Sequence, residues 1–362
     1  MNDVQLMRRA LSAAARAKGN TSPNPMVGAL LTDEAGEIAV RHHERAGKPH
    51  AEAAVIEQAG TRARGATLFV TLEPCVHHGR TPPCVEAIIE AGIARVVVAA
   101  EDPDKRVAGQ GIRLLRAAGI EVHVGLCEAQ ARDLNRAYYH QRLTGLPYVT
   151  LKMAQSLDGA VGARLGETCR LTGERAAMLV RSLRYDNDVV MIGVGTALAD
   201  DPQLTVRPSR WRAVPYLRVV VDSHARLPLT SKLVTDVRQA KTLVACVEDA
   251  EADRRRALED AGVGIVVCAQ NERGGVDLLD LLRRLGRQGT LSVLCEGGPT
   301  LAGSLLQATC VDELQWLVAP VILGTASRAP VIAATSQLKT PLRVRGTRRL
   351  GDDMWISAVR GS

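Results

Sequence analysis

Residues 74–84 read PCVHHGRTPPC and place two cysteines, two histidines and three prolines in eleven positions. Thiolates and imidazoles are the donors that zinc prefers, and a catalytic zinc takes three protein ligands and leaves a fourth position open. Cys75 and Cys84, together with His50 from the upstream segment PHAEAAV, would supply three ligands. The pattern therefore predicts a catalytic zinc site.

Other interpretations of the same stretch have to be weighed. His77 and His78 could be ligands, but donors so close to Cys75 would strain a tetrahedral site. A Cys75–Cys84 disulfide is sterically possible. The eight cysteines are scattered through a long chain, however, which favours a reducing, cytoplasmic setting with metal-binding thiols.

Glu52 lies two residues after His50, at the start of the same predicted helix, and can reach a metal-activated water. His-x-Glu followed by Pro-Cys and a second cysteine is typical of zinc nucleobase deaminases, in which the glutamate carries protons. Cys84 follows two prolines and should begin a helix, whose dipole would lower the pKa of its thiol. The eight residues between the cysteines exceed the usual two and would form a polar lip over the metal.

A second candidate site lies in LSVLCEGGPTLAGSLL, where a strand is followed by two glycines and by Pro299 at a first helical position. A helix N-terminus of this kind can bind phosphate, although a tight strand-to-helix turn is an equally good interpretation. The Gly-x-Gly-x-x-Gly fingerprint of a Rossmann dinucleotide site does not follow any predicted strand.

The composition argues against a nucleic-acid-binding protein, a secreted protein and a membrane-spanning protein. The 362 residues carry a net charge of +7, and the densest basic run, Arg254–Arg256, suits a solvated helix face. With one Phe, five Tyr and three Trp, stacking platforms for single-stranded nucleic acid are scarce. The N-terminal stretch does not resemble a signal peptide, and no apolar run approaches the ~18 residues of a membrane span.

The elements that must position these residues alternate between helix and strand. In the first part we expect helices at 4–18, 50–60, 82–92, 109–119 and 127–143, and strands at 26–32, 66–71, 94–100 and 120–125, with a loop from 33 to 50. In the second part we expect strands at 148–156, 188–193, 217–223, 242–247, 264–269, 291–297 and 314–320. This alternation predicts an α/β protein with a three-layer first domain, 1–146, around a mainly parallel sheet, and a second α/β domain, 147–362.

Several segments resemble the bifunctional riboflavin-biosynthesis deaminase–reductase family. TSPNPMVGALL, HHERAGKPHAEAAVI, TLEPCVHHGRTPPCVEAII and DPDKRVAGQGI resemble its deaminase half. YVTLKMAQSLDGAVG, GVGTALADDPQLTVR and CEGGPTLAGSLL resemble its reductase half. The resemblance covers almost the whole chain in order and includes the long cysteine spacing.

The resemblance implies two consecutive reactions. A cytidine-deaminase-like αβα domain would use Zn²⁺ to remove the ring amino group of 2,5-diamino-6-(5-phosphoribosylamino)pyrimidin-4(3H)-one. A dihydrofolate-reductase-like domain would then use NADPH to give 5-amino-6-(5-phosphoribitylamino)uracil. In the first domain it implies His50, Cys75 and Cys84 as zinc ligands, Glu52 as catalytic residue, and Asn24 and Arg80 as substrate contacts.

In the second domain the resemblance implies two larger sets of contact residues, one for NADPH and one for the substrate. The NADPH contacts would be Ala154, Arg170, Thr196, Asp200, Ser223, Gly298, Pro299, Thr300, Leu301, Ala302, Gly303 and Ser304. The substrate contacts would be Lys152, Thr168, Arg184, Leu204, Arg207 and Glu296, and Asp158 belongs to the same pattern. Arg170 stands where related sequences tend to have Trp, and an arginine could pair with a cofactor phosphate. Asp200 is also a candidate for the catalytic proton donor.

Two other classes of function share part of this pattern. A nucleoside or RNA deaminase with a nucleic-acid-binding second domain would share the zinc site, but it should show basic clusters and stacking aromatics. A zinc-stabilised interaction protein would need four protein ligands, and only three are evident. We therefore expect an enzyme with a phosphorylated small-molecule substrate, a homo-oligomer without nucleic-acid or membrane partners, in the cytoplasm.

Overall fold

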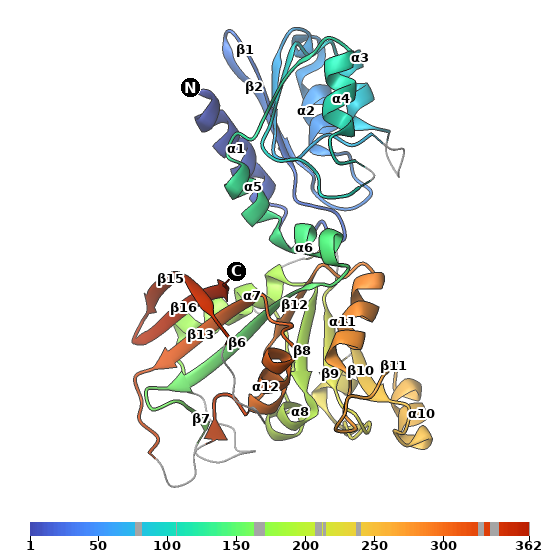
Figure 1. Cartoon of the computed structure of the whole chain (residues 1–362), viewed down its shortest axis with the longest axis vertical. Coiled ribbons are helices and arrows are strands. Elements are labelled where there is room, and N and C mark those ends of the chain that lie inside the picture. Colours follow the sequence, from blue (N-terminus) through green and yellow to red (C-terminus); the bar gives the residue numbers. More distant parts are fainter. Residues whose placement is uncertain are drawn as a thin grey trace. The chain divides into compact units, whose positions relative to one another are not determined.

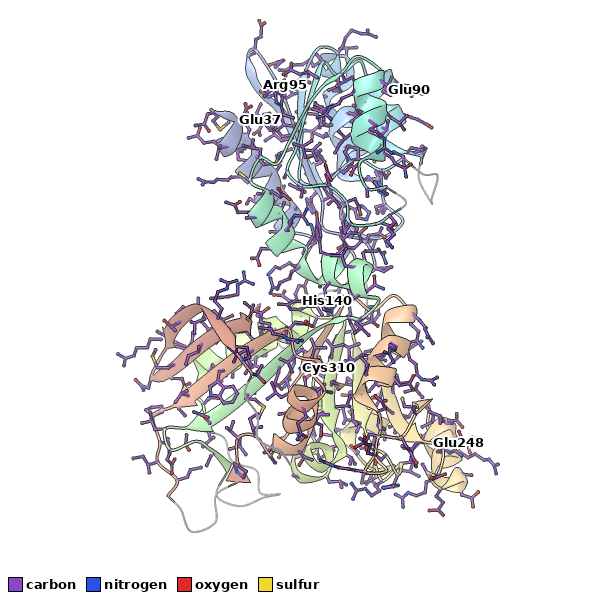
Figure 2. The ribbon with its side chains drawn as sticks, in the orientation of Figure 1. Glu37, Glu90, Arg95, His140, Glu248 and Cys310 are labelled. Carbon is purple, nitrogen blue, oxygen red and sulfur yellow. The ribbon has the colours of Figure 1, made fainter. Side chains whose placement is uncertain are left out.

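The computed structural model describes residues 1–76, 82–105, 107–162, 171–206, 212, 215–236, 240–324, 329–333 and 340–361. The chain divides into two compact units, Met1–Gly145 and Leu146–Ser362 (Figure 1). The boundary between the units lies one residue before the predicted one. In each unit, side chains fill the space between a sheet and the helices that cover it (Figure 2).

Unit 1 contains a five-stranded sheet in the order β2-β1-β3-β4-β5. Its strands are β1 (Gly28–Asp33), β2 (Gly36–His42), β3 (Thr67–Val70), β4 (Arg95–Val98) and β5 (Glu121–Val124). Its helices are α1 (Asp3–Ala15), α2 (Ala51–Ala59), the 3-10 helix η1 (Gly60–Ala63), α3 (Cys84–Glu90), α4 (Gln110–Ala117), α5 (Glu128–Leu134) and α6 (Arg136–Thr144). Helices α2, α3 and α4 cover one face and α1 and α5 the other, which gives the expected three layers (Figure 1).

Two predictions for the sheet of this unit were wrong. The predicted loop at 33–50 contains β2, which pairs antiparallel with β1, and β1 is also antiparallel to β3. Only the β3–β4 and β4–β5 pairs are parallel, so the sheet is mixed rather than mainly parallel. The sequence did not predict β2, because its residues are mostly half-buried and show little apolar alternation.

The predicted helix at 127–143 is in fact two helices, α5 and α6, separated at Asn135. The Asn135 amide accepts a hydrogen bond from Met26 N and donates one to Met26 O, each at 2.8 Å. These long-range bonds hold the 23–27 loop against the helix pair. They depend on tertiary contact and left no signal in the helical periodicity.

Unit 2 contains a nine-stranded sheet in the order β11-β10-β9-β8-β12-β6-β13-β16-β15 and a small β14-β7 pair. The strands are β6 (Tyr148–Ser156), β7 (Ala160–Gly162), β8 (Val189–Gly193), β9 (Leu217–Val221), β10 (Lys241–Val247), β11 (Gly264–Cys268), β12 (Ser292–Cys295), β13 (Glu313–Ala319), β14 (Ala329–Pro330), β15 (Leu342–Leu350) and β16 (Asp353–Arg360). The helices are α7 (Glu174–Asp186), α8 (Val194–Asp200), α9 (Lys232–Thr235), α10 (Ala252–Asp260), α11 (Leu278–Arg287) and α12 (Pro299–Gln307). All seven predicted strands of this unit are present.

The antiparallel hairpin β15–β16 was not predicted. β15 has the sequence LRVRGTRRL and is exposed along most of its length, so it lacks the apolar alternation of a half-buried strand. It occupies one edge of the sheet, and its charged side chains suit an edge strand.

The sheet of unit 2 has a core on each face. On one face, α11 presents Leu278, Leu281, Leu282 and Leu285 at helical spacing, next to residues of α12. On the other face, side chains from α8, α9 and α10 pack against β8, β9 and β10. No helix in the described part of the chain is both long enough and apolar enough to cross a membrane.

Candidate active sites

The three predicted zinc ligands converge at one point in unit 1. His50 is the N-cap residue of α2, Cys84 is the first residue of α3, and Cys75 follows the end of β3. His50 Nδ1 lies 3.1 Å from Cys84 Sγ and 3.5 Å from Cys75 Sγ. All three ligand atoms lie within 4.8 Å of one another.

This cluster fits a zinc ion. At the usual bond lengths of about 2.1 Å to nitrogen and 2.3 Å to sulfur, a tetrahedral zinc holds its ligands about 3.5–3.8 Å apart. Both cysteines are free thiols, so the alternative disulfide is not formed. Two sulfurs, one imidazole and a nearby carboxylate outside the ligand set match a catalytic rather than a structural centre.

The dipole of α3 was expected to lower the pKa of Cys84, but the pKa of this thiol is raised. A hydrogen bond between the two sulfurs lowers the pKa of Cys75 and raises that of Cys84, which is also buried. Cys84 N, at the start of the helix, donates to Cys75 Sγ at 3.4 Å. The helix N-terminus thus stabilises the thiolate of the neighbouring cysteine instead of its own.

Glu52 lies in the first turn of α2 and is 3% exposed. Burial raises the pKa of its carboxyl to about 7, although the neighbouring His50 lowers it. A carboxyl with a pKa near neutrality can both accept and release a proton. Its position beside the three ligands agrees with a proton-carrying role.

Asn24 lines a cavity of about 350 Å³, and His50, Glu52 and Cys75 line the same cavity. Its Nδ2 is 3.2 Å from His43 Nε2, and His43 Nδ1 is 3.1 Å from Pro49 O. Burial lowers the pKa of His43, which favours the neutral ring. Because Nδ1 then donates to the Pro49 carbonyl, Nε2 accepts from Asn24 and fixes the orientation of the Asn24 amide.

Sequence reasoning assigned no role to several other residues of this cavity. Asp102 accepts a hydrogen bond from Tyr138 Oη at 3.1 Å, and burial raises the pKa of its carboxyl to about 6. Arg142 stacks over the Tyr138 ring and lies 3.7 Å from Asp104. DPDKRVAGQGI contains both aspartates, but only the fold brings α6 to this wall.

Glu73 is a further residue that sequence reasoning missed. Its buried carboxylate accepts hydrogen bonds from four main-chain N–H groups, those of Asp102, Gly109, Gly111 and Ile112, at 2.9–3.3 Å. A Cβ at Gly111 would meet Pro74 O at 2.3 Å, so a glycine is required at this close approach. Glu73 and Gly111 thereby tie the segment before Cys75 to the start of α4.

The second site lies in unit 2 around a cavity of about 530 Å³. Arg184 donates from Nε to Glu296 Oε1 at 2.5 Å and from Nη2 to Oε2 at 3.0 Å. Burial opposes ionisation of Glu296, but the Arg184 charge outweighs it and lowers the pKa of the carboxyl. Burial also lowers the pKa of Lys152, on β6. Lys152, Arg184, Leu204 and Glu296, four of the predicted substrate contacts, line this one cavity.

Part of the predicted NADPH site lies at the start of α12. Gly298 is the N-cap residue, Pro299 begins the helix, and Gly298 N donates to Thr196 Oγ1 at 3.0 Å. A Cβ at Gly298 would lie 3.1 Å from Thr196 Oγ1, so the two segments approach closely. The structure thus brings Thr196 beside Gly298 and places Thr300, Leu301, Ala302, Gly303 and Ser304 on α12.

The remaining predicted residues are more dispersed. Ala154 lies on β6, and Ser223 follows β9 and accepts a hydrogen bond from Val276 N at 3.1 Å. Asp158 accepts from Leu323 N and Gly324 N, at 3.1 and 2.9 Å. Asp200 is exposed at the end of α8 and does not line the 530 Å³ cavity, so its catalytic role stays a prediction. Arg80, Thr168, Arg170 and Arg207, like His77 and His78, lie outside the described residues.

Family models match both halves of the chain. Residues 147–356 match the RibD C-terminal domain, and residues 1–100 match the cytidine and deoxycytidylate deaminase zinc-binding region. The two matches fall on the units that hold the second and the first cavity, respectively.

Curated proteins and solved structures extend this similarity over the full length. The riboflavin biosynthesis protein RibD of Aquifex aeolicus is 38% identical over 98% of this chain and 97% of its own, and that of Escherichia coli is 39% identical over 91% and 90%. The solved RibD of Acinetobacter baumannii is 36% identical with a TM-score of 0.90, covering 99% of both chains. A Thermotoga maritima deaminase/reductase is 30% identical with a TM-score of 0.86, covering 99% of this chain and 98% of its own.

Proposed function

The chain belongs to the RibD family of riboflavin-biosynthesis proteins, and from that premise we propose how its own residues divide the two reactions. It is a bifunctional enzyme with a zinc-dependent deaminase domain and an NADPH-dependent reductase domain. The Thermotoga maritima relative is described as a diaminohydroxyphosphoribosylaminopyrimidine deaminase and 5-amino-6-(5-phosphoribosylamino)uracil reductase. We take the same two compounds as the substrates of this chain.

In the deaminase reaction, water replaces the ring amino group and ammonia leaves. We propose that His50, Cys75 and Cys84 hold the zinc, which supplies the Lewis acidity that activates a water at neutral pH. The Glu52 carboxylate accepts a proton from that water and returns it to the departing amino group. The observation that carries this proposal is the convergence of three ligands beside a buried, unligated carboxyl in one cavity.

Asn24 and the lip residue Arg80 would contact the pyrimidine. The support for Asn24 is its place in the cavity and the hydrogen bond from its Nδ2 to His43, which leaves Oδ1 as an acceptor for a substrate N–H. Arg80 is proposed on the family resemblance alone.

In the reductase reaction, bound NADPH would supply the hydride for the ribosyl carbon that becomes part of the ribityl chain, and a proton completes the reduction. We assign Lys152, Arg184, Leu204 and Glu296 to the substrate, because they line one cavity. Thr168 and Arg207 are assigned with them on the resemblance. Arg184 uses Nε and Nη2 on Glu296, so it fixes that carboxylate in addition to any phosphate that it contacts.

NADPH would bind beside the start of α12. Its contacts would be Ala154, Arg170, Thr196, Asp200, Ser223 and the run Gly298–Ser304. The close approach of Thr196 to Gly298 supports this placement, because it joins two of the predicted contact segments. The free thiols of the described cysteines suit a cytoplasmic enzyme. The homo-oligomer stays a prediction.

The variant Glu52→Gln tests the deaminase assignment. It should retain one zinc per chain by metal analysis but lose ammonia release by about 10²-fold or more, because general acid–base catalysis contributes on that order. Glu57→Gln, at an exposed position of the same helix, is the matched control and should behave like the wild type. Ammonia release near the wild-type rate in Glu52→Gln would remove Glu52 from the mechanism.

A coupled assay tests the division of labour. With the diaminopyrimidine substrate, Glu52→Gln should neither release ammonia nor oxidise NADPH. With the deaminated substrate it should oxidise NADPH at the wild-type rate. NADPH oxidation with the unprocessed diaminopyrimidine would contradict the assigned order of reactions.

A further inference from the structure

One wall of the reductase cavity is a short loop whose main-chain carbonyls accept hydrogen bonds from side chains outside the loop. Pro202–Thr205 line the cavity. Three successive carbonyls of this loop accept hydrogen bonds from three different side chains. Arg218 Nη1 donates to Gln203 O at 3.1 Å, Tyr216 Oη to Leu204 O at 3.0 Å, and Arg184 Nη1 to Thr205 O at 3.2 Å.

Two of these donors come from the same strand face. Tyr216 precedes β9 and Arg218 lies within it, two residues apart, so their side chains point to the same side of the sheet. Val220 continues this face and packs in the same core as Tyr216 and Leu204. The strand thus presents two hydrogen-bond donors in a region that is otherwise apolar.

Arg218 is an unusual residue for that position. It is 0% exposed, and its guanidinium also donates to Leu233 O, Asp236 O and Ala240 O, at 3.4, 3.0 and 2.6 Å. Burying a cation is costly unless several hydrogen bonds satisfy it. Four main-chain carbonyls from three segments accept hydrogen bonds from Nη1 and Nη2 here, while Nε has no partner among the described residues. These bonds connect the loop, the end of α9 and the turn before β10 to one side chain.

The loop needs such support because its backbone is strained. Leu204 has φ +51°, and Asp201, the residue just before the loop, has φ +38°, and neither is glycine. A non-glycine residue in this region is energetically unfavourable, and it persists only where surrounding contacts determine it. Leu204 is also 4% exposed, so both its side chain and its carbonyl are fixed from within the core.

We propose that Tyr216 and Arg218 are positioning residues of the reductase, which hold Gln203–Thr205 in the strained shape that receives the substrate. Neither residue is among the lining of the cavity, so both act through the loop. This inference rests on the proposed assignment of the cavity to the reductase substrate. It adds a second layer of residues that set the shape of that cavity.

Tyr216→Phe tests the proposal with the smallest change. It removes the hydroxyl that donates to Leu204 O and keeps the buried ring. We expect the KM for 5-amino-6-(5-phosphoribosylamino)uracil to rise about fivefold to tenfold, as the loss of one hydrogen bond implies. The KM for NADPH and the ammonia release of unit 1 should stay within twofold of the wild type.

Tyr148→Phe is the matched control. Tyr148 Oη donates to Glu313 Oε2 at 3.2 Å in the same unit, and Tyr148 does not line the cavity. A purely structural role of Tyr216 would lower the melting temperature in both variants and leave both KM values unchanged. That result would overturn the inference.

Arg218→Lys extends the test to the second residue. Lysine keeps the charge but cannot reproduce the forked geometry that reaches four carbonyls. In the folded variant, judged by NADPH binding, we expect a larger rise in the substrate KM than in Tyr216→Phe. An unchanged KM in Arg218→Lys would restrict the role of Arg218 to stability and contradict the proposal.

A third variant separates this inference from the proposed function. Arg184→Lys alters a residue that lines the cavity itself. If Arg184→Lys raises the substrate KM and Tyr216→Phe does not, the positioning role fails while the site assignment stands. If neither variant changes the substrate KM, the assignment of the cavity fails.

Discussion

At the scale of single residues, two buried glutamates show how surroundings assign a role. Burial raises the pKa of Glu52 to about 7. The side chain of Glu296 is 7% exposed, yet Arg184 and Lys152 lower its pKa. One carboxyl can therefore exchange a proton near neutral pH, whereas the other is a fixed anion suited to binding.

Arg184→Lys should show that the pairing with Glu296 needs the forked guanidinium. Lysine cannot make two parallel hydrogen bonds to one carboxylate, so Glu296 would be left partly unsatisfied. We expect the substrate KM of the reductase to rise about tenfold, equivalent to about 1.4 kcal/mol. Steady-state NADPH oxidation at varied substrate concentration measures this. An unchanged KM would mean that the pair is only structural.

At the scale of elements, the starts of helices and the ends of strands position the zinc ligands. The start of α2 carries His50, the start of α3 carries Cys84, and Cys75 follows β3. The Glu73 carboxylate joins the segment before Cys75 to the start of α4, where helix N–H groups lack intrahelical partners. The geometry of the metal site thus depends on contacts between elements that contribute no ligand.

Glu73→Gln should weaken this junction. The amide offers one acceptor oxygen where the carboxylate offers two. Some of the four N–H groups would therefore lose their hydrogen-bond acceptor. We expect the free energy of unfolding of the first unit to fall by about 2 kcal/mol, the range for hydrogen bonds to a charged group. Calorimetry measures this loss, and zinc affinity should fall with it.

Glu90→Gln is the control for that variant, because Glu90 is exposed at the end of α3 (Figure 2). It should leave both unfolding and zinc affinity unchanged. Equal behaviour of the two variants would show that Glu73 does not support the site.

Gly28→Ala should disrupt the packing of α1 on β1. A Cβ at Gly28 would lie 2.1 Å from Ala10 O and 2.9 Å from Ala14 N, which are main-chain atoms of a helix. The helix must shift, and overpacking of this kind costs about 1–3 kcal/mol. Thermal unfolding of the variant measures the loss. Gly195→Ala, where a Cβ meets nothing within 4 Å, should leave the melting temperature unchanged.

At the scale of the whole molecule, each unit has its own sheet, its own core and its own cavity. The zinc ligands lie in Met1–Gly145, and the residues of the 530 Å³ cavity lie in Leu146–Ser362. The residues proposed for each reaction therefore lie within a single unit.

Removal of zinc by a chelator should separate the two activities in the intact protein. Ammonia release should be lost, because the ligand cluster has no ion to hold the water. NADPH oxidation with the deaminated substrate should stay within about twofold of its original rate, and added zinc should restore ammonia release. Loss of both activities on chelation would contradict the independence of the two sites.

The sequence by itself determined the chemistry and most of the elements. His-x-Glu, Pro-Cys and the second cysteine predicted a zinc centre that the structure assembles, because short motifs at strand ends and helix starts carry their own local geometry. Strong apolar periodicity predicted the buried strands of the second unit. It did not reveal β2, whose residues are mostly half-buried, or β15, which is exposed along most of its length.

Only the tertiary structure decided which distant residues support these sites. The bonds from Asn135 to Met26, from Glu73 to the start of α4, and from Tyr216 and Arg218 to Gln203 and Leu204 join segments up to 109 residues apart. A side chain that bonds to main chain leaves no pattern of residue types at its target, because every residue offers the same carbonyl and every residue except proline the same N–H. For that physical reason the ligands were evident in the sequence, whereas the residues that hold them in place became visible only in the fold.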